Sequence, residues 1–192
     1  MNFNEFTIVI TGLGGQGLIR LIHILGQALV SNGYNVISSE THGLSQRGGN
    51  VTCFLRFGNK LNSPIPLVGS ADMIIALEES SILNVLKYAK VDKSSLLIIS
   101  TYEKKGISIE YPPLPSLLKI LFKISDNLYF IPASEITLKY KGDLKYMNTL
   151  ILGYILRFLP IDREEIENIL RESFSGNKYQ TNIEMLDKGI DL

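Results

Sequence analysis

Short apolar runs and segments of helical periodicity alternate along the first two thirds of the chain. Continuous apolar runs are typical of strands buried in the middle of a sheet. They predict strands at residues 6–10, 35–39, 72–77, 96–100 and 128–131, and alternation of side chains predicts a further strand at residues 51–57. Apolar positions at helical spacing predict intervening helices at residues 18–31, 80–90 and 116–123. This alternation predicts an α/β fold: a Rossmann-like, mostly parallel open sheet with helices on both faces.

The pattern becomes wholly helical after Pro132. It predicts helices at residues 133–139, 144–158, 163–173 and 181–188, with Pro160 and Gly176 as helix stops. Asp162 is placed to cap the third of these helices. No repeat, linker-like change of composition or charged tract divides the sequence. Residues 1–192 are therefore expected to form one domain with a helical C-terminal segment.

A glycine-rich segment, TGLGGQG at residues 11–17, joins the first predicted strand to the first predicted helix. Glycine lets the backbone turn sharply and approach a ligand, and unpaired N–H groups at a helix start attract phosphate or carboxylate. The spacing G-x-G-x-x-G is that of dinucleotide-binding folds, and Glu40 has the position of their ribose-binding acid. The predicted ligand-binding residues here are Gly12, Gly14, Gly15, Gln16, Gly17 and Glu40. The alternative is a tight turn that binds no ligand.

A second glycine-rich segment, ETHGLSQRGG at residues 40–49, follows the second predicted strand. Loops at the carboxyl ends of parallel strands line the ligand crevice of open α/β sheets, so we expect the two segments to lie side by side. The planar guanidinium of Arg47 beside accessible backbone suits a phosphate, a carboxylate or an acidic group of a partner. Gln46, Gly48 and Gly49 join it as predicted ligand-binding residues. Alternatively, Arg47 only pairs with Glu40.

Two other groups of residues could carry chemistry. His42 can titrate near neutrality and, with Arg47, is a catalytic candidate, although no cysteine or serine nucleophile stands beside it in an elbow motif. Glu78 and Glu79 follow a predicted strand and could be an acid–base pair or metal ligands. Negative charge at a helix start also complements the helix dipole, and we favour that interpretation. Cys53 alternates onto the apolar face of its strand and is predicted to be a core thiol.

Charge and composition restrict the partners. Nineteen basic and nineteen acidic residues leave no net charge, and no Lys/Arg-rich run occurs, so neither nucleic acid nor an anionic membrane is expected as a partner. No apolar run approaches the length of a membrane span, and a cytoplasmic location is expected. One cysteine and two histidines cannot assemble an iron–sulfur cluster, and no metal site is expected in this chain.

The two glycine-rich segments, with LRFG at residues 55–58 and Ser63-Pro64, resemble the gamma domain of the 2-oxoacid:ferredoxin oxidoreductases. The Glu-Thr-His-Gly form is most similar to the beta subunit of indolepyruvate ferredoxin oxidoreductase. The resemblance continues through residues 71–78, 111–113, 131–133 and 148–153 and through Asn182 and Gly189. Leu21 departs from it, because these folds usually keep a small residue against the sheet at that position.

This resemblance implies a subunit of an enzyme that oxidatively decarboxylates a 2-oxoacid to acyl-CoA and passes the electrons to ferredoxin. It also implies that thiamine diphosphate, Mg and iron–sulfur clusters belong to a large partner subunit, with coenzyme A at the interface. A hetero-oligomer that is inactive without the large subunit is expected. Two other interpretations remain open from the residues: a stand-alone nucleotide-binding or NAD-dependent protein, and a non-catalytic oligomerisation module.

Overall fold

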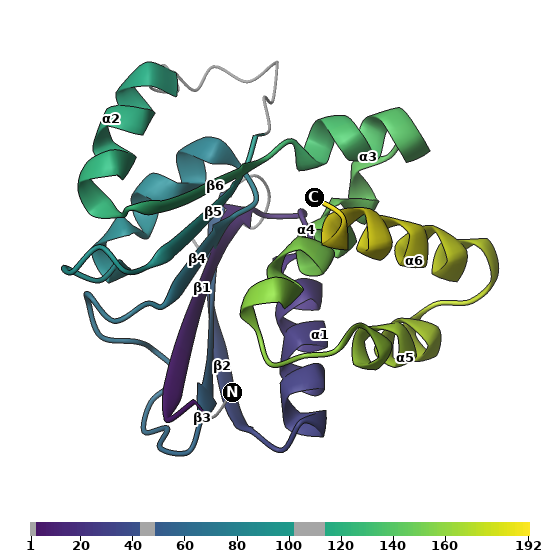
Figure 1. Cartoon of the computed structure of the whole chain (residues 1–192), viewed down its shortest axis with the longest axis horizontal. Helices are drawn as coiled ribbons and strands as arrows, with labels where there is room; N and C mark the ends of the chain where they lie inside the picture. The colour runs from purple at the N-terminus through teal and green to yellow at the C-terminus, as the bar shows by residue number, and fades with distance from the viewer. Residues whose placement is uncertain (1–2, 43–48, 102–113) are drawn as a thin grey trace.

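The computed structural model describes residues 3–42, 49–101 and 114–192. In this part of the chain a six-stranded sheet has the order β2-β3-β1-β4-β5-β6 (Figure 1). Its strands are β1 (Glu5–Leu13), β2 (Asn35–His42), β3 (Asn50–Gly58), β4 (Met73–Ala76), β5 (Leu96–Ser100) and β6 (Asn127–Ile131). β3 is antiparallel to both β1 and β2, and the remaining pairs are parallel. The predicted fold class, a mostly parallel α/β sheet, is confirmed.

Helices cover both faces of the sheet (Figure 1). The α-helices are α1 (Leu18–Ser31), α2 (Leu114–Ile124), α3 (Ala133–Lys141), α4 (Met147–Ile155), α5 (Arg163–Ser173) and α6 (Gly176–Ile190). Short 3-10 helices are η1 (Glu79–Asn84), η2 (Leu86–Tyr88), η3 (Leu144–Tyr146) and η4 (Leu156–Phe158). None of the helices in the described ranges is long and apolar enough to cross a membrane.

Alternate strand residues enter two separate apolar cores, as the period of a strand requires. In β1, Ile8 and Ile10 face the core that α1, α4, α5 and α6 cover, whereas Val9 faces the smaller core beneath α2, η1 and η2. Cys53 of β3 lies fully buried in the larger core, as predicted. Because helices cover both faces of the sheet, consecutive residues of the central strands are buried, and this explains the continuous apolar runs in their sequences.

Two glycines bring α4 and α6 into backbone contact. A Cβ atom on Gly153 would lie 2.1 Å from the carbonyl oxygen of Leu186, and one on Gly189 would lie 1.9 Å from that of Leu150. Since real Cβ atoms do not approach a carbonyl oxygen so closely, neither position accepts a side chain without moving a helix. The resemblance at Gly153 and Gly189 therefore has a structural cause: these residues set how α6 packs on α4.

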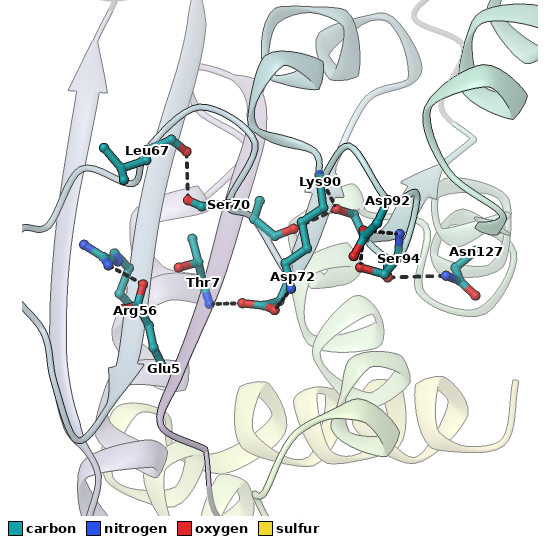
Figure 2. Close-up of polar contacts among 12 residues, drawn as sticks. Glu5, Thr7, Arg56, Leu67, Ser70, Asp72, Lys90, Asp92, Ser94 and Asn127 are labelled. Atoms are coloured by element: carbon teal, nitrogen blue, oxygen red, sulfur yellow. Dashed lines mark hydrogen bonds and ion pairs between the residues drawn. The ribbon is translucent and has the colours of Figure 1, made fainter.

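The amino-terminal edge of the sheet is joined by charged and polar side chains (Figure 2). The Asp72 carboxylate, just before β4, accepts a hydrogen bond from the Thr7 N–H at 2.7 Å and pairs with Lys90. Arg56 of β3 is buried, pairs with Glu5 at the start of β1 and donates to the Ser63 carbonyl. These contacts tie the starts of β1 and β4 to their neighbours.

Three predicted elements need correction. The helix predicted at residues 80–90 is instead the two 3-10 helices η1 and η2. A 3-10 helix rises more per residue than an α-helix, which lets this short segment return along the sheet to where Ala89 bridges Ala71. The helix predicted at residues 144–158 is divided into η3, α4 and η4. Gly176 does not stop a helix; it is the first residue of α6, which begins five residues before the predicted 181.

Candidate functional site

The glycine-rich turn lies at the carboxyl edge of the sheet, between the end of β1 and the start of α1. Gly15 has a φ of 95° and Gly17 a φ of 78°, both in the left-handed region that glycine tolerates. Gly17 is the N-cap of α1 and supplies no side-chain cap, and the first turn of α1 has no acidic residue. The positive end of the helix dipole is therefore not neutralised by the helix itself.

Gln16 folds its side chain back into the turn. Its Oε1 accepts a hydrogen bond from the Leu13 N–H at 2.7 Å. A Cβ on Gly12 would lie 2.6 Å from the same oxygen, and Gly12 is part of β1, not of the turn. The absent side chain at Gly12 thus makes room for the Gln16 amide, and the Leu13 N–H already has its acceptor.

Asn148 of α4 fastens the turn from the helical side. Its Nδ2 donates to the Gln16 carbonyl at 2.5 Å, and a Cβ on Gly17 would lie 2.5 Å from that nitrogen. Its Oδ1 is buried and has no hydrogen-bond partner among the described residues. The sequence pointed to Asn148 only through the family resemblance, because 132 positions separate it from Gln16. The structure brings the two together.

The second glycine-rich segment meets the first. The Gly14 N–H donates to the Gly49 carbonyl at 2.9 Å, which confirms for Gly49 that the segments lie side by side. Gln46, Arg47 and Gly48 lie outside the described residues. His42 ends β2 opposite Val51, which is itself opposite Gly12, but its side chain also lies outside the described part of the chain.

Glu40 does not have the neighbours that a ribose-binding acid would need. It lies within β2 and is exposed, and β3 separates it from β1, whereas the fingerprint places its acid on the strand next to the glycine turn. Two strand spacings amount to about 10 Å. The placement expected for Glu40 was therefore wrong, because antiparallel pairing inserts a strand that the pattern of apolar runs does not reveal.

Cys53 faces Glu40 in the register of β2 and β3. Burial, and secondarily the Glu40 carboxylate, raise the pKa of the Cys53 thiol from 9.0 to about 11. The thiol is protonated near neutral pH and is not a nucleophile.

A cavity of about 330 Å³ opens beside the turn. Its lining comprises Leu13, Gly14, Gly15 and Gln16 on one side and Leu144, Lys145 and Met147 on the other. Lys145 is the one charged residue in this described lining. The free space, the glycine backbone at Gly14 and Gly15 and the Lys145 ammonium, which pairs with Asp143, together suit a phosphate or carboxylate.

Glu78 is buried near the same edge and caps η1. Its carboxylate accepts from the Ser80 N–H at 3.3 Å, the Ser81 N–H at 3.0 Å and the Ser80 hydroxyl at 2.8 Å. The interpretation of Glu78 as a helix-start charge is confirmed. Among the described residues, no group of three His, Cys, Asp or Glu side chains could hold a metal ion.

The chain matches the model of the pyruvate ferredoxin/flavodoxin oxidoreductase family over residues 7–192. The chain belongs to this family. It is 32% identical to the indolepyruvate oxidoreductase subunit IorB of Archaeoglobus fulgidus, over 96% of this chain and 94% of that subunit. It is 28% identical to the pyruvate/ketoisovalerate oxidoreductases common subunit gamma of Pyrococcus furiosus, over 89% and 88% of the two chains.

Solved structures share the fold. Pyruvate oxidoreductase subunit PORC of Thermotoga maritima superposes with a TM-score of 0.74 at 19% identity, over 98% of this chain and 97% of that one. The 2-oxoglutarate:ferredoxin oxidoreductase of Magnetococcus marinus superposes with a TM-score of 0.76 at 18% identity. That match covers 99% of this chain but 31% of the larger one. The family member described here is thus a subunit of an oxidoreductase, similar to small subunits of hetero-oligomeric complexes.

The cofactors that the family implies do not fit the side chains of this chain. An iron–sulfur cluster needs several thiolates, and the single cysteine, Cys53, is buried in the core with its proton held. A magnesium ion bound to a diphosphate usually takes one or two carboxylate ligands from the protein, but no carboxylate belongs to the described lining of the cavity at the turn, and Asp143 beside it is paired with Lys145. No step of the reaction is therefore assigned to these groups in this chain.

Proposed function

We propose that this chain is the small, cluster-free subunit of a 2-oxoacid:ferredoxin oxidoreductase that acts on indolepyruvate or another 2-oxoacid. The family match over residues 7–192, with full-length similarity to IorB subunits, carries the proposal. The complex would decarboxylate the 2-oxoacid oxidatively to an acyl-CoA and pass the electrons to ferredoxin. The whole of residues 1–192 would act as one domain of that complex.

The large partner subunit would carry thiamine diphosphate, Mg and the iron–sulfur clusters. Two observations support this division: the lone buried cysteine and the absence of carboxylates from the described lining at the turn. The chain alone would be inactive, since it offers no redox centre.

The carboxyl edge of the sheet would complete a wall of the shared active site. Gly15, the start of α1 and Lys145 would bind an anionic group, such as a phosphate of coenzyme A or the substrate carboxylate. Arg47 would add a guanidinium from the neighbouring segment, which meets the turn at Gly49. Gln16 and Asn148 would hold the turn in shape, and Gln16 also lines the cavity.

Reconstitution with the large subunit tests this proposal. The two chains together should form a stable complex that reduces ferredoxin or a dye when a 2-oxoacid and coenzyme A are added. The small chain alone should give no reduction, and Arg47→Lys in the complex should lower kcat/KM by about thirtyfold or more, because lysine cannot reproduce a bidentate contact. Full turnover by the isolated small chain would overturn the proposal.

The NAD-dependent alternative loses support from the strand order, which removes Glu40 from the strand beside the turn. Calorimetric titration of the chain with NAD or NADP should therefore show no saturable heat. Micromolar binding that disappears in Glu40→Ala would restore that alternative.

A further inference from the structure

A second cavity, of about 210 Å³, lies on the helical side of the molecule between α1, the start of α4 and the start of α6. It is separate from the cavity at the glycine turn, with which it shares only Lys145 among the described lining residues. Its floor is apolar and well buried: Leu21 and Ile24 come from α1 and Leu152 from α4. The ring of Phe174 closes one side.

Three cations surround the opening of this cavity: Arg20, Lys145 and Lys178. No aspartate or glutamate belongs to its described lining. Lys145 pairs with Asp143, but Arg20 and Lys178 form no ion pair with any described carboxylate. The positive charge at the opening is therefore only partly neutralised by the protein.

Arg20 is held in place although it has no anionic partner. Its guanidinium carbon lies 4.7 Å from the centre of the Phe174 ring, so the side chain stacks over the wall of the cavity. A guanidinium stacked in this way keeps its N–H donors at its rim, where they can bind a carboxylate. A freely solvated surface arginine would not be positioned like this.

Neutral polar groups line the inner part of the cavity. Asn182 is buried; its Oδ1 accepts from the Thr149 hydroxyl at 2.6 Å and its Nδ2 donates to the Lys178 carbonyl at 2.8 Å. Asn148 also lines the cavity, with its Oδ1 unpartnered among the described residues. These amides order the wall without adding negative charge, so they do not repel an anion.

We propose that this cavity is a binding site for a small organic anion: a carboxylate attached to an aromatic or branched aliphatic body. The body would occupy the apolar floor beside Phe174, and the carboxylate would contact Arg20 and Lys178. The volume of about 210 Å³ is below the usual range for drug-sized ligands, so the cavity would take only a small ligand, of about one ring and a short acidic arm. Because Asn148 lines the cavity and also holds the Gln16 carbonyl, occupancy would be transmitted to the glycine turn.

The test is a methyl NMR titration of the full-length chain with phenylacetate, and with phenylacetamide as a neutral probe of the same shape. Phenylacetate should cause saturable shifts at the methyl groups of Leu21, Ile24 and Leu152, and phenylacetamide should bind at least about tenfold more weakly. Arg20→Gln and Lys178→Gln should each raise the Kd for phenylacetate by about tenfold or more.

Lys119→Gln is the matched control, since this exposed lysine lies on α2, which packs on the opposite face of the sheet. It should leave the Kd unchanged. All the changed side chains are exposed, so the variants should stay folded, and signals away from Arg20, Phe174 and Lys178 should match the wild-type spectrum of the free protein. Three results would each overturn the proposal: no saturable shift up to on the order of 10 mM phenylacetate, equal binding of the amide, or wild-type affinity in both Arg20→Gln and Lys178→Gln.

Discussion

The two edges of the sheet are held together by different chemistry. At the amino edge, opposite charges meet: Lys90 with Asp72, and Arg56 with Glu5 (Figure 2). At the carboxyl edge, the turn is held by backbone and amide groups: Gly14 with Gly49, Gln16 with Leu13, and Asn148 with Gln16. The amino edge satisfies its charges internally, whereas at the carboxyl edge Gly14, Gly15 and Lys145 line a cavity, and Lys145 is paired there with Asp143. The first turn of α1, next to this cavity in the chain, has no acidic residue to neutralise its dipole.

We propose that this difference separates a structural edge from a binding edge. Ion pairs that neutralise each other leave no field for a ligand, and they contribute modestly to stability when partly exposed. A turn fastened by uncharged groups keeps its positive helix end available for an anion. Loss of contacts at the carboxyl edge should therefore affect function, and loss of contacts at the amino edge should affect only stability.

The largest effect is expected at the support beneath the carboxyl edge. Gly189→Ala would place a Cβ 1.9 Å from the Leu150 carbonyl oxygen and push α6 away from α4, the helix that carries Asn148. We expect a loss of about 3 kcal/mol or more in the free energy of unfolding, measured by urea denaturation.

Gly26→Ala, in the interior of α1, is the control, because its Cβ would make only ordinary contacts of 3.6 and 3.8 Å. It should be neutral or stabilising by up to about 1 kcal/mol. Equal destabilisation of both variants would show that the α4–α6 contact is not special.

The next effect is expected at the turn itself. Asn148→Ala removes the donor to the Gln16 carbonyl and should lower the free energy of unfolding by about 1–3 kcal/mol. It should also broaden or shift the amide NMR signals of Gly15 and Gly17, which α4 would no longer restrain. If those signals stay as in the wild type, Asn148 does not hold the turn.

The smallest effect is expected at the amino edge. Lys90→Met removes a partly exposed ion pair while Asp72 keeps its hydrogen bond from the Thr7 N–H. The free energy of unfolding should fall by about 1 kcal/mol or less, and the difference from the wild type should shrink in high salt. Activity of the reconstituted complex should not change. A large kinetic defect in Lys90→Met would mean that the amino edge also takes part in function.

Local patterns predicted most of the elements but not how the strands pair. The bounds of α1, α5 and β5 follow from apolar spacing and, for α5, from a helix start where Glu165 accepts from the Asp162 N–H at 3.1 Å. The insertion of β3 between β1 and β2 could not be predicted, because a run such as residues 51–57 fits a parallel or an antiparallel neighbour equally well. Because β3 lies between β2 and β1, Glu40 is not on the strand next to the glycine turn.

The candidate site was only partly predictable for a similar reason. Gly15 and Gly17 were expected at a turn, and their positive φ angles agree. The role of Gln16 depends on its side chain folding back, and that of Asn148 depends on a contact across 132 positions. Such long-range contacts leave no periodic signal in one sequence. They come from the packing of α4 beside α1.

A comparison of Gly15→Ala with Gly33→Ala in the reconstituted complex tests most directly whether function lies at the carboxyl edge. Both glycines have a positive φ, 95° and 82°, and a Cβ on either would meet nothing within 4 Å. Each variant should therefore lose a similar free energy of unfolding, about 1 kcal/mol.

The two variants should differ in activity, because Gly15 lines the cavity at the turn, whereas Gly33 lies beyond the far end of α1. We predict that Gly15→Ala lowers kcat/KM for the 2-oxoacid or coenzyme A by about tenfold or more, and that Gly33→Ala stays within about twofold of the wild type. Equal kcat/KM values for the two variants would contradict the assignment of this edge to the active site.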